Sequence, residues 1–181
     1  MRSVKSHITI IAIALLGLQS CRKLGLCHDA QLSNKVAYSG PELRTDGYYY
    51  ADLPTRQTVM IFYNNGVVML PGGTDSTGAA ALVQSFIDDK TSGYGKVRYG
   101  WGVFFVKGAE LTFENWPPTF MGCSPLEQTT GQIVNDTTFT LTKQITKNNK
   151  GKTERELTLN ETYHFRPLTI KPDSTNEIVG E

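Results

Sequence analysis

A tight hairpin between two apolar runs constrains the fold of this chain more than any other feature of its sequence. Residues 58–63 have the sequence TVMIFY and residues 67–70 the sequence VVML, with Asn64-Asn65-Gly66 between them. An Asn-Gly pair flanked by apolar runs favours a tight hairpin, because both residues tolerate a positive φ angle. The two runs are therefore predicted to be neighbouring antiparallel strands.

The strand pattern recurs over most of the chain. Further strands are predicted at residues 47–53, 96–106, 110–116, 131–134, 137–142 and 155–165. In residues 137–142, threonines alternate with Phe139 and Leu141, which gives the strand one dry and one wet face. Such a meander has to cover its dry faces and its edges, and closure does both. We therefore predict a mainly β fold, in which about eight antiparallel strands, consecutive in sequence, close into a barrel.

One segment departs from this pattern. Its apolar residues recur at the spacing of one helix face: Ala79, Leu82, Val83, Phe86 and Ile87. A short helix at about residues 79–89 is therefore predicted to cover one side or end of the sheet. The preceding stretch 72–78 (GGTDSTG) lacks the Gly-Lys-[Ser/Thr] ending of a phosphate-binding loop, so it is interpreted as a loop that leads into the helix.

The N-terminus has the organisation of an export signal. Arg2 and Lys5 precede an apolar run, 8–18, that is shorter than the roughly 20 residues a membrane-spanning helix needs. Residues 18–21 (LQSC) then resemble the lipobox of bacterial lipoproteins, in which the chain is cleaved before a diacylated cysteine. The resemblance implies a signal peptide at residues 1–20, a lipid on Cys21 and a membrane anchor through that lipid. The alternative is an ordinary cleaved signal with an incidental cysteine.

Export also bears on the two other cysteines, Cys27 and Cys123. Paired thiols normally form disulfides in an oxidising compartment, so these two are predicted to be bonded to each other. The alternative is two unpaired, buried cysteines. A metal site is not predicted, because His28 and His164 are the only histidines after residue 20 and no C-x-x-C spacing occurs.

The chain beyond the signal divides into three parts. Residues 21–46 are predicted to form the lipidated cysteine and a tether, 47–166 one β-barrel domain, and 167–181 a C-terminal tail against it. Removal of residues 1–20 leaves 16 basic residues (18 − 2) against 17 acidic ones. The mature chain is therefore not basic, as a nucleic-acid-binding domain usually is, so no nucleic-acid partner is predicted.

Three stretches also resemble a known class of barrel: residues 47–50 (GYYY), the Asn65-Gly66 hairpin and residues 101–113 (WGVFFVKGAELTF). Together they resemble the lipocalin-like (calycin-type) barrels of small bacterial envelope lipoproteins. The resemblance covers roughly 47–166 and implies a barrel that binds an apolar small molecule or serves as an envelope module. The helix at 79–89 departs from the simple meander of that class.

The sequence offers only weak candidates for a catalytic site. Ser124, His164 and Asp136 supply the residue types of a hydrolase triad, but His164 alternates with Tyr163 and Phe165 and is expected to point outward. Asp88-Asp89 is placed at a helix end. Glu110 and Glu114 are placed on the wet face of a strand, so neither pair is assigned an acid/base role. No enzymatic activity and no cofactor are predicted.

Aromatic residues near strand ends are the candidates for a ligand pocket, although packing is the expected role of most of them: Tyr49, Tyr99, Trp101 and Trp116. The sequence thus predicts a lipid-anchored envelope protein, facing the periplasm from the outer membrane, that binds a small apolar or amphipathic ligand or a protein partner. The alternative is a structural or accessory lipoprotein with a filled barrel that docks on an outer-membrane complex.

Overall fold

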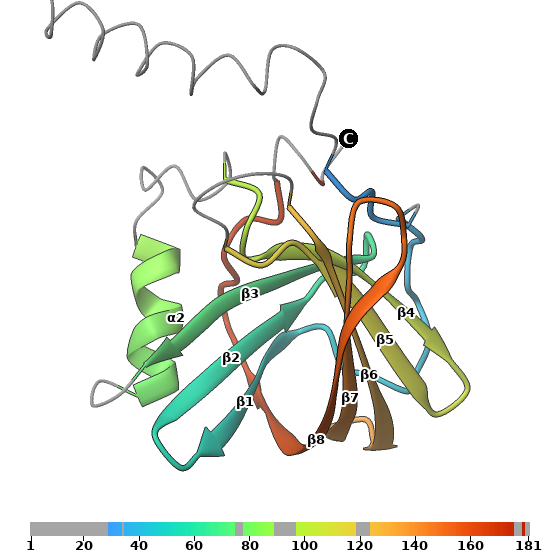
Figure 1. The fold of residues 1–181 in the computed structure, drawn as a ribbon. Coiled ribbons are helices and arrows are strands. Elements are labelled where there is room, and N and C mark those ends of the chain that lie inside the picture. The colour runs from blue at the N-terminus through green and yellow to red at the C-terminus, as the bar shows by residue number, and fades with distance from the viewer. Residues whose placement is uncertain are drawn as a thin grey trace, which may run out of the picture.

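In the described part of the chain, eight antiparallel strands follow one another around a closed barrel, and a helix lies outside it (Figure 1). The computed structural model describes residues 29–33, 35–74, 78–88, 97–118, 124–175 and 179. The elements are β1 (Gly47–Leu53), β2 (Arg56–Phe62), β3 (Val67–Thr74), α2 (Gly78–Asp88), β4 (Trp101–Lys107), β5 (Glu110–Asn115), β6 (Leu126–Asn135), β7 (Thr138–Lys147) and β8 (Thr153–Pro167). The predicted fold class, a mainly β meander that closes into a barrel with one short helix, is confirmed.

The predicted Asn65-Gly66 hairpin joins β2 to β3. The Tyr63 amide donates to the Val67 carbonyl at 2.9 Å, and Gly66 has a φ of 84°. A Cβ atom on Gly66 would lie 2.1 Å from the Val36 carbonyl oxygen, so this position needs glycine both for its dihedral angle and for space.

Strand boundaries depart from the prediction at several ends. The strand predicted from residue 96 begins at Trp101, because Gly100 has a φ of 82° and the described residues before it form a turn. β6 begins at Leu126, five residues before its predicted start at residue 131, and its first half is rich in polar side chains that do not follow an apolar alternation.

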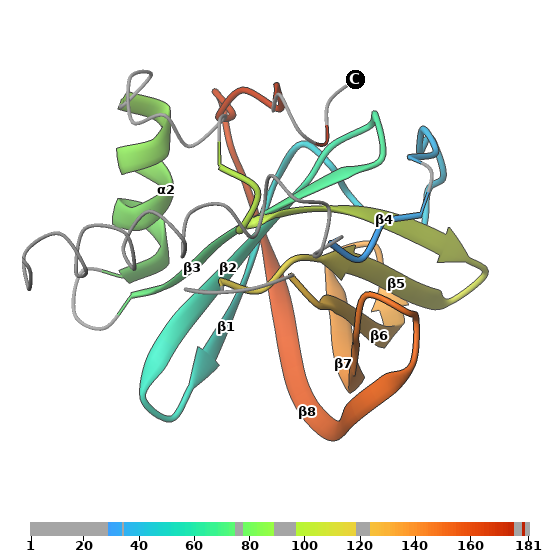
Figure 2. The same cartoon turned by 45° about the horizontal axis from the view of Figure 1, so that its top comes forward.

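Two hydrophobic clusters lie on opposite sides of the barrel wall. The inner cluster is aromatic: the Phe62 ring lies 4.9 Å from that of Phe104 and 5.8 Å from that of Phe139, centroid to centroid. The outer cluster includes Ala79 and Val83, through which α2 packs on β2 and β3 (Figures 1 and 2). No helix among the described residues is long and apolar enough to cross a membrane.

The described part of the predicted tether packs against the barrel instead of extending from it. The Tyr38 ring lies edge-on to Phe104 at 5.5 Å, and Leu43 is buried. The Tyr38 amide donates to Asn64 O in the β2–β3 turn, and the Arg44 amide to Asp136 O in the β6–β7 turn. This segment therefore plugs the end of the barrel that carries those turns, which we call the closed end.

The described part of the C-terminal tail lies at the closed end as well. Lys171 Nζ donates to Thr45 O at 2.5 Å and to Phe62 O at 2.8 Å, and it lies 4.1 Å from the centre of the Tyr63 ring. The Tyr63 hydroxyl donates to Pro172 O at 3.1 Å. The tail is thus held by hydrogen bonds to the segment before β1 and to the end of β2.

Two of the strand pairings are short, and both lie toward the closed end of the barrel. β1 pairs with β8 only from Gly47 to Tyr50, and β3 pairs with β4 only from Val67 to Met69. By contrast, β6 and β7 pair from Leu126 to Asn135. We call these two short pairings the seams. Beyond them, within the described residues, the ends of β1, β2 and β3 diverge from the rest of the barrel wall. We call this the open end.

Candidate functional site

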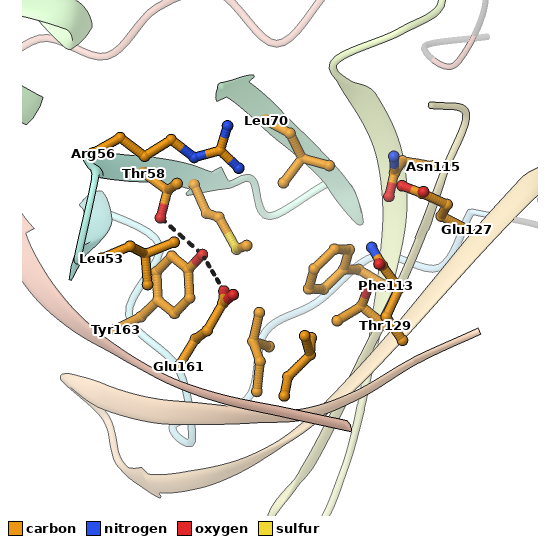
Figure 3. Close-up of a pocket in the computed structure, with 14 residues that line it drawn as sticks. Leu53, Arg56, Thr58, Leu70, Phe113, Asn115, Glu127, Thr129, Glu161 and Tyr163 are labelled. Atoms are coloured by element: carbon orange, nitrogen blue, oxygen red, sulfur yellow. Dashed lines mark hydrogen bonds between the residues drawn. The ribbon is translucent and has the colours of Figure 1, made fainter. Parts of the chain in front are cut away.

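A cavity of about 240 Å³ lies inside the barrel at the open end (Figure 3). Its apolar lining comes from six strands and consists of Leu53, Met60, Leu70, Phe113, Leu141 and Leu159. Its polar lining consists of Arg56, Thr58, Asn115, Glu127, Thr129, Gln144, Glu161 and Tyr163. A pocket that combines apolar side chains with convergent polar groups is the usual form of a small-molecule site.

One cluster of polar side chains in the cavity is centred on the hydroxyl of Tyr163. This hydroxyl lies 2.9 Å from Thr58 Oγ1 and donates to Glu161 Oε2 at 3.3 Å (Figure 3). Burial raises the pKa of Tyr163, so the hydroxyl keeps its proton at neutral pH. Because that single proton goes to Glu161, the Thr58 hydroxyl is the donor to Tyr163.

A second cluster of polar side chains lies across the cavity, on β5 and β6. Asn115 and Glu127 are cross-strand partners, and Thr129 faces the cavity two residues further along β6. Burial raises the pKa of the Glu127 carboxyl, and a hydrogen bond from Asn115 and the charge of Arg155 oppose this only in part. The Thr129 hydroxyl is buried, with no hydrogen-bond partner among the described residues.

The charges of the lining are unevenly placed. Glu127 and Glu161 contribute two carboxylates from the β6 and β8 walls. Arg56, at the start of β2, is the one guanidinium among the described lining residues, and its side chain is exposed. The walls are therefore acidic, and the cation lies at the solvent-exposed rim.

The four aromatic residues predicted to line a pocket do not border this cavity. Tyr49 points into the barrel near the closed end, where its hydroxyl accepts from the Arg44 amide and donates to Asp136 O. Trp101 and Trp116 belong to the outer cluster, and Tyr99 is 48% exposed. Trp116 Nε1 donates to Ala30 O at 2.6 Å, which ties the N-terminal segment to the outer wall.

The three cysteines, Cys21, Cys27 and Cys123, lie outside the described residues, so their predicted roles stay predictions. The described neighbours of the predicted disulfide are nevertheless close. The Ala30 amide donates to Ser124 O at 3.0 Å, and the Ser124 amide to Asp29 Oδ1 at 2.6 Å.

The cavity residues were not predicted from the sequence, because they are polar residues that interrupt the apolar alternation of their strands. Glu161 occupies an inward position between Leu159 and Tyr163, where the alternation predicts an apolar residue. Glu127 and Thr129 likewise face inward from the polar first half of β6. A polar residue on a dry face is the pattern that indicates a lined cavity.

The structure does not assemble the triad of Ser124, His164 and Asp136. Ser124 precedes β6 and Asp136 follows it, so they lie at opposite ends of a ten-residue strand about 30 Å long. His164 is exposed and its ring lies 6.2 Å from that of Tyr50, so the expectation that it points outward is confirmed.

The prediction that Glu114 lies on a wet face is wrong. Glu110 is exposed, but Glu114 is only 4% exposed because the segment 29–33 covers this part of the outer wall. Its Oε2 accepts from the Ser33 amide at 2.8 Å and its Oε1 from Gln128 Nε2 at 3.1 Å. Alternation identifies the face of a strand, but it does not reveal what packs on that face.

No group of three His, Cys, Asp or Glu side chains that could hold a metal ion occurs in the described parts of the chain. No protein-family model, curated protein or solved structure matches this chain. The barrel and its cavity are therefore the basis on which a function is inferred.

Proposed function

We propose that this chain is a lipid-anchored envelope protein whose lipocalin-like barrel binds a small amphipathic molecule and catalyses no reaction. The observation that carries the proposal is the cavity, about 240 Å³ in volume, which is lined by both apolar side chains and convergent polar groups. The docking alternative predicts a filled barrel, so the cavity supports the binding proposal over it.

The cavity volume limits the size of the ligand. A cavity of about 150 Å³ holds benzene, which has six heavy atoms, so a cavity of 240 Å³ holds a molecule of about ten. A long acyl chain would have to extend through the open end. The proposed ligand is therefore a compact molecule with an apolar body and at least one polar group.

The proposed anchor would orient the open end toward the membrane. Asp29 and Ala30 are hydrogen-bonded to Ser124, which directly precedes β6 at the open end. The eight residues from Cys21 to Asp29 span at most about 28 Å when fully extended. A lipid on Cys21 would thus keep the mouth of the cavity near the membrane surface.

Native mass spectrometry of the protein, gently extracted from its own host, tests the binding proposal. We expect a stoichiometric extra mass on the wild type, absent from an unfolded control. Leu159→Trp, which fills the cavity, should abolish it. Thr158→Trp places the same side chain at the exposed neighbouring position and should retain the extra mass. A bare wild-type mass, or the same extra mass on both variants, would contradict the proposal.

The anchor has an independent test. Cys21→Ser should abolish metabolic acyl labelling and release the protein from membranes, whereas Cys27→Ser should leave both unchanged. Persistent labelling of Cys21→Ser would contradict the lipid assignment without affecting the cavity.

A further inference from the structure

The polar groups of the β6 wall are suited to a hydrogen-bond donor. Glu127 and Thr129 are two residues apart on one strand and face the same side, so their Cα atoms are about 6.6 Å apart. The Thr129 hydroxyl has almost no accessible surface, so a nitrogen atom hydrogen-bonds to both groups only by inserting between the two side chains. Gln144, the cross-strand neighbour of Thr129 on β7, adds an amide oxygen at the same place.

Two features of this wall indicate that a partner belongs there. The Thr129 hydroxyl is only 2% exposed and has no hydrogen-bond partner among the described residues, and an unpartnered buried polar group is costly. Burial also disfavours the charged form of the neighbouring Glu127 carboxyl, as its raised pKa shows. A bound cation would satisfy the hydroxyl and stabilise the carboxylate together.

The opposite wall favours the same sign of ligand charge. Glu161 extends into the cavity from β8 (Figure 3), so a ligand anion would meet two carboxylates, whereas Arg56 lies at the exposed rim. An ammonium group has three donors and no acceptor, so it can donate to the Glu127 carboxylate, to the Thr129 hydroxyl oxygen and to the Gln144 amide oxygen.

We propose that the cavity binds a small amine, with its ammonium group between Glu127 and Thr129 and its apolar body against the leucines and Phe113. This inference rests on the proposed binding function and adds the chemical class of the ligand to it. It distinguishes an amine from a fatty acid, whose carboxylate would have to pair with Arg56 at the rim.

Titration calorimetry of the full chain at pH 7 with three probes of matched size tests the inference. The probes are 2-phenylethylamine, 2-phenylethanol and phenylacetate, each of about ten heavy atoms, the size that the cavity allows. We expect the amine to bind at least tenfold more tightly than the other two. Glu127→Gln and Thr129→Val should each weaken the amine by roughly 10- to 100-fold, the range for losing a hydrogen bond to a charged group.

A matched control is Glu156→Gln, because Glu156 is exposed and pairs with Lys143 away from the cavity. It should leave amine affinity unchanged, and thermal melts of all variants should show intact folding. Equal affinities for the three probes, or tightest binding of phenylacetate with loss in Arg56→Gln, would overturn the amine inference and leave the binding proposal standing. Binding of none of the three would count against both.

Discussion

Two glycines in neighbouring hairpins test whether the segment before β1 belongs to the folded domain. Gly66 in the β2–β3 hairpin and Gly108 in the β4–β5 hairpin have φ angles of 84° and 60°. Alanine at either position costs about 1–2 kcal/mol in the left-handed conformation. Loss of glycine's freedom in the unfolded chain offsets part of this cost equally in both variants.

Only Gly66 has a second penalty. An added Cβ at Gly108 meets no atom within 4 Å, but at Gly66 it lies 2.1 Å from the Val36 carbonyl oxygen. Val36 would have to move by at least about 0.9 Å, the difference between 3.0 and 2.1 Å. That shift strains the Tyr38–Asn64 hydrogen bond and the packing behind it, worth about 2 kcal/mol together.

We therefore expect Gly66→Ala to lower the free energy of unfolding by about 2 kcal/mol more than Gly108→Ala does, or about 4–8 °C in Tm. Urea unfolding followed by the fluorescence of the buried Trp101 and Trp116 measures the difference. Equal destabilisation by the two substitutions would refute the reasoning. Residues 35–46 would then behave as the free tether that the sequence predicted.

Three further predictions concern charge and cross-linking. Burial lowers the pKa of Lys171 to about 8 from its usual 10.5, so the unfolded chain binds more protons between these values. Stability should therefore rise from pH 7.5 to 9.5, by at most about 2 kcal/mol because the side chain is partly exposed, and Lys171→Met should lose the rise in urea midpoints. Alkylation of the non-reduced protein should find Cys27 and Cys123 protected, and Cys27→Ser should cost up to about 4 kcal/mol, since the closed loop is long. Glu114→Gln should destabilise by about 1–2 kcal/mol in thermal melts, because it loses a charge-assisted hydrogen bond, whereas Glu110→Gln should be neutral.

Each of these has a clear contrary result. A pH-dependent rise of the same size in Lys171→Met would show that another group causes it. Two free thiols in the non-reduced protein would exclude the disulfide. Equal effects of the two glutamate substitutions would mean that segment 29–33 does not cover the outer wall as described.

The fold class was predictable because its determinants are local. Alternation assigned Phe139, Leu141 and Tyr163 to the inside, and the Asn65-Gly66 turn set one hairpin, both of which the structure confirms. Strand ends were less predictable. The start of β6 is polar because those side chains line a cavity, and a strand with polar residues on both faces resembles a loop in sequence.

The candidate site was not predictable from residue type alone. Tyr49 and Tyr163 both point into the barrel, but Tyr49 lies near the closed end and Tyr163 beside the cavity. Which inward residue borders free space depends on the register of strands that are distant in sequence and on what closes each end. Neither can be derived from one strand at a time.

The two short seams divide the barrel wall into two parts of unequal size, β1–β3 and β4–β8. Within the described residues, each part is held together by longer ladders than those that join the two parts. Spreading the free ends of Ala51–Leu53 and Pro71–Thr74 breaks no ladder between the two parts, because these ends pair with β2 alone. Widening of the barrel at its mouth would therefore leave these ladders intact, but it would break the hydrogen bond between Thr58 of β2 and Tyr163 of β8. Exchange of the proposed ligand would then need only a local motion, whose rate is independent of global unfolding.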